Sequence, residues 1–407
     1  MSESYNISFP QGTGSFGETP SPGMKRTRSP FMGCFGFVGA IILLFLIVMA
    51  GIFFIYPAMT PDKIRGNLLD FTIVPQKDGS SRIWVLTDGS FNFIQTTKSP
   101  GSYSSGRKCY FCKTWLYVID PNDMKVIKKT KTEFDDIITT TNLVYSNDKV
   151  YQITYGYGKN EPKIVVCNAE TGDKILDSKD FVEKYSELSS GLADLHYDKK
   201  ENILRITTKD GRNDVTYSLE NETMYPSYSK YRENLENDST KGTAFVMASE
   251  NSSGPRKVLY LVRGTKGTLR NNLSSLDSYV SNESTLEFFV KGATAEKMSN
   301  KIFLEGIIYH QDNDCAVIIH VSQIGKKADR IMTCIDNTGK EKWSVTQEQL
   351  FNKMKVDEEK DSFSSIFFTK DKIGVNRSGN LIVLKLDGEG IMGFDYNSGK
   401  KLFTLDI

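Results

Sequence analysis

The chain has 407 residues, of which 39% are hydrophobic and 25% are charged, and its formal net charge at pH 7 is +1. This is the composition of an ordinary globular protein, and it excludes a collagen-like or wholly disordered chain. The balanced charge gives no electrostatic reason to expect nucleic acid as a partner. About 340 residues follow the longest apolar run, which is enough to bury a large core.

The longest apolar run covers residues 31–56 (FMGCFGFVGAIILLFLIVMAGIFFIY) and holds no charged side chain. As a helix it would reach roughly 39 Å at ~1.5 Å per residue, whereas the hydrocarbon core of a bilayer is ~30 Å thick. The run therefore predicts a single transmembrane helix. A cleaved signal peptide is the competing interpretation. The run is too long for one and no small-x-small cleavage site is well placed behind it, so we favour an uncleaved signal anchor.

The segment before this run, residues 1–30, is rich in Gly, Ser, Thr and Pro and has almost no apolar periodicity. We expect it to be a disordered cytosolic tail. Three cations end the tail (Lys25, Arg26 and Arg28), and only two follow the run closely. Because positive residues tend to stay on the cytoplasmic side, this modest difference favours a cytosolic N-terminus and an extracytoplasmic C-terminal part.

Beyond a short linker at residues 57–67, the pattern changes to short runs rich in Val, Ile, Tyr, Phe and Thr. Turn sequences such as KDGS, SNDK and AETGD separate these runs. Short β-branched and aromatic runs between turns are typical of strands. Long stretches with a 3.6-residue period are scarce, so residues 68–407 are predicted to form one all-β domain.

A turn pattern repeats within this domain. An Asp or Asn ends a strand, a Gly follows three or four residues later, and a large apolar residue lies four residues after the Gly. The three copies are Asn168, Gly172 and Leu176; Asp336, Gly339 and Trp343; and Asp395, Gly399 and Phe403. A looser copy runs from Asp120 to Ile127, with Asp123 in place of the glycine. The carboxylate or amide can accept backbone N–H groups, and Gly reaches a positive φ without strain.

The spacing of these copies predicts a β-propeller. Asp120 and Asn168 are 48 residues apart, and Asp336 and Asp395 are 59 residues apart. Intervals of this size suit one four-stranded blade each. The longer middle interval leaves room for two or three blades without the turn pattern. We predict six blades, with seven as the alternative.

The turn pattern resembles the repeat of quinoprotein-type β-propellers, a family with quinoprotein alcohol dehydrogenases and the propeller lipoprotein of outer-membrane protein assembly. Residues 334–343 (CIDNTGKEKW) and 393–403 (GFDYNSGKKLF) carry the resemblance. In that family a Trp docks adjacent blades. The resemblance therefore implies the docking role for one residue of each copy: Ile127, Leu176, Trp343 and Phe403.

The dehydrogenases of this family use calcium, an Asp base and a pair of adjacent cysteines, and no Cys-Cys pair occurs in this sequence. The chain thus resembles the non-enzymatic scaffold members more closely. His196, His310 and His320 form no HExxH pair, and the sequence has no GxSxG motif or P-loop. Asp312-Asn313-Asp314 is interpreted as a hairpin turn because no calcium-loop Gly and Glu follow it. We therefore predict no catalytic, cofactor-binding or metal-binding residues.

The cysteines leave alternatives open. Cys109 and Cys112 form a CxxC motif, which suits a local disulfide, a redox or metal-binding pair, or free thiols. A second disulfide is predicted between Cys315 and Cys334, which flank a candidate hairpin with its turn near Gly325. Cys167 would then remain single and buried.

These features predict a propeller tethered to the cytoplasmic membrane by one helix, with the domain on the extracytoplasmic side. Its expected function is that of a non-enzymatic scaffold or sensor that binds a protein on one propeller face, without cofactor or nucleic acid. The alternative is a redox or quinoprotein-like enzyme that uses the propeller funnel or the Cys109/Cys112 pair.

Overall fold

The computed structural model describes most of the chain after residue 63 and one short helix before it. The described residues are 41–49, 64, 66–88, 93–98, 105–110, 114–132, 141–156, 161–211, 214–250, 254–269, 286, 292–298, 300–324, 328–354 and 372–407. The chain divides into two compact units, Met1–Pro61 and Asp62–Ile407.

In the first unit, residues 41–49 (IILLFLIVM) form a helix whose large apolar side chains are exposed. Among the residues that the structure describes, no helix is long and apolar enough to cross a membrane. The predicted tail at residues 1–30, the rest of the predicted span at 31–56 and most of the linker at 57–67 lie outside the described residues.

The second unit is all-β, as the sequence predicted, and in its described part four sheets have four antiparallel strands each. The first sheet contains β1 (Leu68–Pro75), β2 (Ser81–Asp88), β5 (Thr114–Ile119) and β6 (Val126–Lys131). The second contains β7 (Thr141–Ser146), β8 (Lys149–Thr154), β9 (Lys163–Asn168) and β10 (Lys174–Leu176). The third contains β11 (Leu192–Asp198), β12 (Ile203–Thr208), β13 (Asp214–Ser218) and β14 (Thr223–Tyr225). The last contains β22 (Ile373–Ser378), β23 (Leu381–Leu386), β24 (Gly390–Asp395) and β25 (Lys401–Asp406).

A seven-stranded sheet lies between the third and the last sheets in chain order. Its strands are β15 (Lys241–Ser249), β16 (Arg256–Thr265), β17 (Thr294–Lys297), β18 (Phe303–Gln311), β19 (Cys315–Val321), β20 (Arg330–Asp336) and β21 (Glu341–Val345). A separate hairpin of β3 (Phe93–Lys98) and β4 (Ser105–Tyr110) is inserted between β2 and β5.

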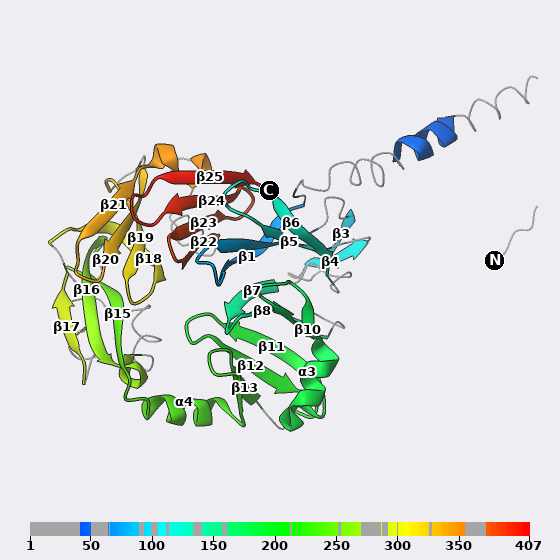
Figure 1. Ribbon diagram of the computed structural model, residues 1–407, viewed down its shortest axis with the longest axis horizontal. Helices are drawn as coiled ribbons and strands as arrows, with labels where there is room; N and C mark the ends of the chain where they lie inside the picture. The colour runs from blue at the N-terminus through cyan, green and yellow to red at the C-terminus, as the bar shows by residue number, and fades with distance from the viewer. Residues whose placement is uncertain are drawn as a thin grey trace, which may run out of the picture. The chain divides into compact units, whose positions relative to one another are not determined.

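The sheets of this unit surround a common centre (Figure 1). Strands of several sheets meet there: β1 contacts β7 and β22, and β18 contacts β15 and β22. Each chain segment then runs outward through its sheet, with β25 on the outside of the last one. This arrangement is consistent with a β-propeller.

Buried apolar side chains fill the spaces between neighbouring sheets. Separate clusters join the first sheet to the second, the second to the third, and the seven-stranded sheet to the last. The first and last sheets share a further cluster, in which Phe71 and Val85 lie with Val383 and Phe403. The N-terminal and C-terminal sheets are therefore joined by side-chain packing, and each is made from its own end of the chain.

Short helices lie between the sheets. They are α3 (Ser178–Lys184), η2 (Ser186–Leu188), α4 (Tyr228–Glu236), η3 (Gln347–Gln349) and η4 (Asn352–Met354). Asp177 begins α3 with a capping box, in which its side chain accepts the backbone N–H groups of Lys179 and Asp180. Tyr231 and Leu235 of α4 pack on Ile203, so α4 covers the third sheet.

Candidate functional site

Each predicted turn copy connects two neighbouring strands: β5 to β6, β9 to β10, β20 to β21, and β24 to β25. In the last sheet, Asp395 accepts the backbone N–H of Ser398 at 2.7 Å, and Gly399 has a φ of +68°. In the seven-stranded sheet, Asp336 accepts the N–H of Lys340 at 3.0 Å, and Gly339 has a φ of +84°. The other two copies make the same kind of turn. Asn168 accepts the backbone N–H groups of Glu170 and Thr171, and Gly172 has a φ of +71°. Asp120 accepts the backbone N–H of Asn122.

The predicted docking residues occupy different environments. Trp343 lies against Gly399 of the last sheet, and its Nε1–H donates to the carbonyl oxygen of Tyr396 at 2.7 Å. Phe403 lies in the cluster between the first and last sheets. Leu176 is partly buried against the cluster between the second and third sheets. These three side chains therefore lie at interfaces between neighbouring sheets.

The prediction for Ile127 is wrong, because this side chain is 48% exposed. Lys128 makes the contact instead: its Nζ donates to the carbonyl of Thr171 at 2.9 Å and pairs with Asp173 at 2.9 Å. Leu176 and Phe403 each lie eight positions after the Asn or Asp that begins their turn. Lys128 has the same spacing from Asp120. A shift of one residue along a strand exchanges its two faces.

The predicted disulfide between Cys315 and Cys334 is not present, and both are buried free thiols. In the hairpin Cys315 pairs with Asp336, and Cys334 pairs with Val317. The two cysteines are thus diagonal neighbours, a position where Cα atoms are ~7–8 Å apart and too distant for ordinary disulfide geometry. A hydrogen bond with Cys334, together with burial, raises the pKa of the Cys315 thiol. Cys167 is also buried and free.

The CxxC motif is described only in part. Cys109 belongs to β4, where its backbone pairs with Ile94, and Cys112 lies outside the described residues. Whether the two sulfurs form a disulfide or a redox pair therefore stays a prediction.

The histidines make local contacts. His320 is buried beside Thr333, with 3.1 Å between Nε2 and Oγ1, and burial lowers its pKa to about 4. His196 stacks on Tyr155 with ring centroids 5.9 Å apart. His310 lies 3.1 Å from Asp312. Within the described ranges, no three His, Cys, Asp or Glu side chains come together in a group that could hold a metal ion.

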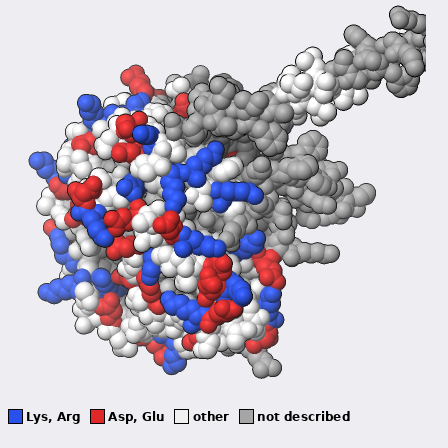
Figure 2. Space-filling model, turned by 45° about the vertical axis from the view of Figure 1, so that its right-hand side comes forward, with Lys and Arg blue, Asp and Glu red and all other residues white. Residues whose placement is uncertain are grey.

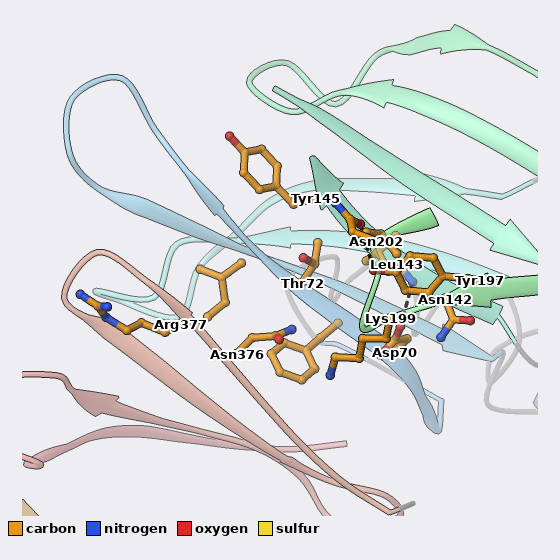
Figure 3. Close-up of a pocket in the computed structure, with 13 residues that line it drawn as sticks. Asp70, Thr72, Asn142, Leu143, Tyr145, Tyr197, Lys199, Asn202, Asn376 and Arg377 are labelled. Carbon is orange, nitrogen blue, oxygen red and sulfur yellow. Dashed lines mark hydrogen bonds between the residues drawn. The ribbon is translucent and has the colours of Figure 1, made fainter. Parts of the chain in front are cut away.

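A polar cavity of about 300 Å³ lies where the first strands of several sheets meet (Figure 3). Its wall comes from β1, β7, β22 and the turn between β11 and β12. The polar and charged lining residues are Asp70, Thr72, Asn142, Tyr145, Tyr197, Lys199, Asn202, Asn376 and Arg377. This central cavity is the candidate functional site.

Hydrogen bonds fix one side of the central cavity. Asp70 accepts the backbone N–H of Leu143 at 2.8 Å. The hydroxyl of Tyr155 donates to Oδ1 of Asn142 at 2.6 Å and accepts the N–H of Tyr197 at 3.2 Å. Burial raises the pKa of both tyrosines, and nearby carboxylates raise it further. Both phenols are therefore neutral donors at pH 7.

The other side of the cavity ends at Arg377, which joins the last sheet to the seven-stranded sheet. Its Nη1 pairs with Asp312 at 2.7 Å and Asp314 at 3.0 Å, and its guanidinium lies 3.8 Å from the ring centre of Tyr396. Burial alone would raise the pKa of Asp312. The hydrogen bond from His310, the N–H of Asp314 and the charge of Arg377 outweigh burial and hold that pKa well below its usual range.

Lys199 has a different environment. It lies in the turn between β11 and β12, where it is exposed to solvent at the cavity wall. Burial lowers the pKa of its ammonium group, Asp70 acts in the opposite direction and Lys385 lowers it further. The sequence predicted none of the cavity residues, since they belong to no motif and meet only through the arrangement of the sheets.

The visible outer face of the second unit carries charges of both signs (Figure 2). Figure 2 shows Lys and Arg interspersed with Asp and Glu over the visible face of the second unit. This mixture agrees with the net charge of +1. The central cavity is thus better defined as a candidate site than the visible outer face.

Comparisons with known proteins give weak similarities. No family model matches the chain, and no curated protein matches it. Among solved structures, the chain is similar to BamB from Moraxella catarrhalis, with 11% identity and a TM-score of 0.21, over 84% of this chain and 74% of that chain. An acylaminoacyl peptidase from Pyrococcus horikoshii has 11% identity and a TM-score of 0.29, with 81% of this chain and 44% of that one covered.

A third similar structure is the quinohemoprotein alcohol dehydrogenase ADHIIG from Pseudomonas putida HK5. It has 11% identity and a TM-score of 0.19, with 72% of this chain and 57% of that one covered. At these identities and scores, function has to be argued from the residues of this chain.

Proposed function

We propose that this chain is a membrane-tethered, six-bladed β-propeller that binds a protein partner and acts as a non-enzymatic scaffold or sensor. The observation that carries the proposal is the central cavity, about 300 Å³ in volume, to which four strand regions contribute polar side chains. A cavity with a few converging polar groups is the usual form of a recognition site.

The blade count rests on the sheet topology. Each of the four-stranded sheets is one blade, which gives four. Within the seven-stranded sheet, β16 and β18 are joined only by the pairs Arg256 with Leu304 and Lys257 with Phe303. Division at this join gives one blade from β15 to β17 and another from β18 to β21. The total is then six.

The tether rests on the helix of residues 41–49. The apolar side chains from Ile41 to Val48 are each between 49% and 63% exposed. Leaving apolar surface in water costs about 25 cal/mol per Å², so this helix is more stable against lipid than in solvent. The uncharged sequence on both sides of it extends the apolar region to residues 31–56.

We expect the full chain to remain in the membrane fraction after alkaline carbonate extraction, because an apolar helix is held by the bilayer core and not by charge. A variant that lacks residues 31–56 should be recovered in the soluble fraction. Release of the full chain by carbonate would contradict the tether. Cell fractionation followed by immunoblotting gives the answer.

Photo-crosslinking in living cells tests the partner. A benzophenone analogue of phenylalanine at Tyr145, an aromatic residue of the cavity wall, is expected to give one discrete protein adduct. The control places the analogue at Leu402, which is 51% exposed on the outer strand β25. No adduct from Tyr145, or the same adducts from both positions, would overturn the scaffold proposal.

A further inference from the structure

The central cavity has three formally charged lining residues, Asp70, Lys199 and Arg377. Arg377 is neutralised outside the cavity by Asp312 and Asp314. The carboxylate of Asp70 accepts the N–H of Leu143 and lies 3.8 Å from Nζ of Lys385. Two of the three charges therefore have counter-charges in the protein.

Lys199 is the exception. Among the described residues, no hydrogen bond or ion pair joins its Nζ to another side chain, and Asp70 acts on it only through longer-range attraction. Asp198 holds the backbone of this turn by accepting the N–H groups of Lys200 and Glu201. The backbone of the turn that carries Lys199 is thus held in place, and its ammonium group is available to a ligand (Figure 3).

Three amide side chains line the same space, and one of them, Asn202, is hydrogen-bonded to Tyr197 and Ser146. Oδ1 of Asn142 accepts the hydroxyl of Tyr155, which leaves its Nδ2 group as a donor. Asn376 makes no side-chain hydrogen bond with the described residues. It lines the cavity together with Lys199 (Figure 3). The cavity therefore offers one ammonium group and amide donors, which together match a group that only accepts hydrogen bonds.

We propose that the central cavity binds a carboxylate of the partner polypeptide, either an Asp or Glu side chain or the C-terminal group. Lys199 is the counter-ion, and Asn142 and Asn376 donate the flanking hydrogen bonds. This inference rests on the proposed function and names the chemical group that is recognised. One cation without a close counter-charge suits a monoanion, and Asp70 in the same wall opposes a dianion such as phosphate. A volume of about 300 Å³ is at the lower end for ligand cavities and suits one side chain.

Short peptides serve as probes of the full chain in detergent. Acetyl-Gly-Glu-Gly-amide carries an internal carboxylate, acetyl-Gly-Gly-Gly carries a terminal one, and acetyl-Gly-Gln-Gly-amide is the neutral control. Butyrate, a free monocarboxylate, and inorganic phosphate complete the set. Isothermal titration calorimetry reports binding of each probe without any activity assay. We expect at least one carboxylate peptide to bind more tightly than the glutamine peptide and than phosphate.

Lys199→Gln is expected to weaken carboxylate binding by about tenfold or more, since a hydrogen bond to a charged group contributes about 1.5–3 kcal/mol. Lys200→Gln is the matched control, because Lys200 is the next residue of the same turn and does not line the cavity; it should bind as the wild type does. Lys199→Arg should retain preference for the carboxylate peptide.

Several results would overturn the inference. Equal binding of the glutamine and carboxylate peptides would exclude charge recognition, and an unchanged affinity in Lys199→Gln would exclude Lys199 as the counter-ion. Phosphate binding as tight as that of the peptides would exclude the carboxylate assignment. Binding of butyrate without either peptide would exclude a polypeptide as the source.

The two proposals fail separately. If the cellular adduct from Tyr145 persists in Lys199→Gln, the scaffold proposal stands and the carboxylate inference is wrong. If the carboxylate peptides bind but no cellular adduct forms, the cavity recognises the predicted group and the scaffold proposal is wrong.

Discussion

Replacement of Trp343 by alanine is expected to lower the free energy of unfolding by about 3–5 kcal/mol. The side chain is 7% exposed and lies in the cluster between the seven-stranded and last sheets. A Cβ added at Gly399 would lie 2.7 Å from the indole, which shows how closely the turn and the ring pack. Truncation leaves a cavity between two sheets and removes the donor to the Tyr396 carbonyl. Urea unfolding of the full chain in detergent, followed by far-UV circular dichroism, measures the change.

Leu402→Ala is the control for this measurement, because Leu402 is 51% exposed on β25, the strand that follows the Gly399 turn. Its expected effect is within about 0.5 kcal/mol. Trp343→Phe should give an intermediate loss, since it keeps most of the packing and removes the hydrogen bond. A loss below about 1 kcal/mol for Trp343→Ala would mean that the ring does not stabilise the interface between the two sheets.

The sequence predicted the turns well because their causes are local. The side chain of Asp336 bonds to backbone groups two and four residues later, and Gly339 provides the positive φ between them. Such contacts depend on a few neighbouring residues and are readable from one segment. The alternation of apolar residues likewise identified the strands and the all-β class.

The sequence could not predict contacts that depend on register. Ile127 and Lys128 are adjacent, and only the strand face decides which one contacts the next turn. The same holds for Cys315 and Cys334, where an offset of two residues makes them diagonal neighbours instead of opposite partners. In both cases a shift of one or two positions along a strand decides which side chains are in contact.

The candidate site was beyond sequence reasoning for a different reason. Asp70 and Arg377 are about 300 residues apart in the chain, and both line one cavity because the first and last sheets meet. Lys199 and Lys200 are the same residue type in one turn, and only the fold directs Lys199 to the cavity. Without an arrangement of the sheets, neither pattern nor spacing distinguishes these residues from other surface charges.

Arg377→Ala is expected to lower the free energy of unfolding by about 1–3 kcal/mol at pH 7, between the effect of an exposed ion pair and that of a buried one, because Asp312 is 33% and Asp314 is 62% exposed. The Arg377 side chain is 11% exposed and pairs across two sheets with Asp312. Its Nε also donates to the carbonyl of Gly379 at 3.1 Å. Arg377→Lys should recover only part of the loss, because an ammonium group lacks the planar donors of the guanidinium.

The acid dependence of this variant tests the coupling to Asp312. The pKa of Asp312 is lowered in the folded state, so its contribution to stability is present above its unfolded pKa of about 3.9 and is lost as the pH falls through the folded value. Without Arg377 that pKa rises, although His310 and the N–H of Asp314 still lower it, and less stability is left to lose on acidification. The difference between wild type and Arg377→Ala should therefore be largest near pH 7 and should narrow below about pH 4. Urea unfolding at pH 7, 5 and 3 measures it. A difference that stays constant over this range would mean that Arg377 stabilises the sheet interface through Tyr396 and Gly379 alone, independently of the Asp312 charge.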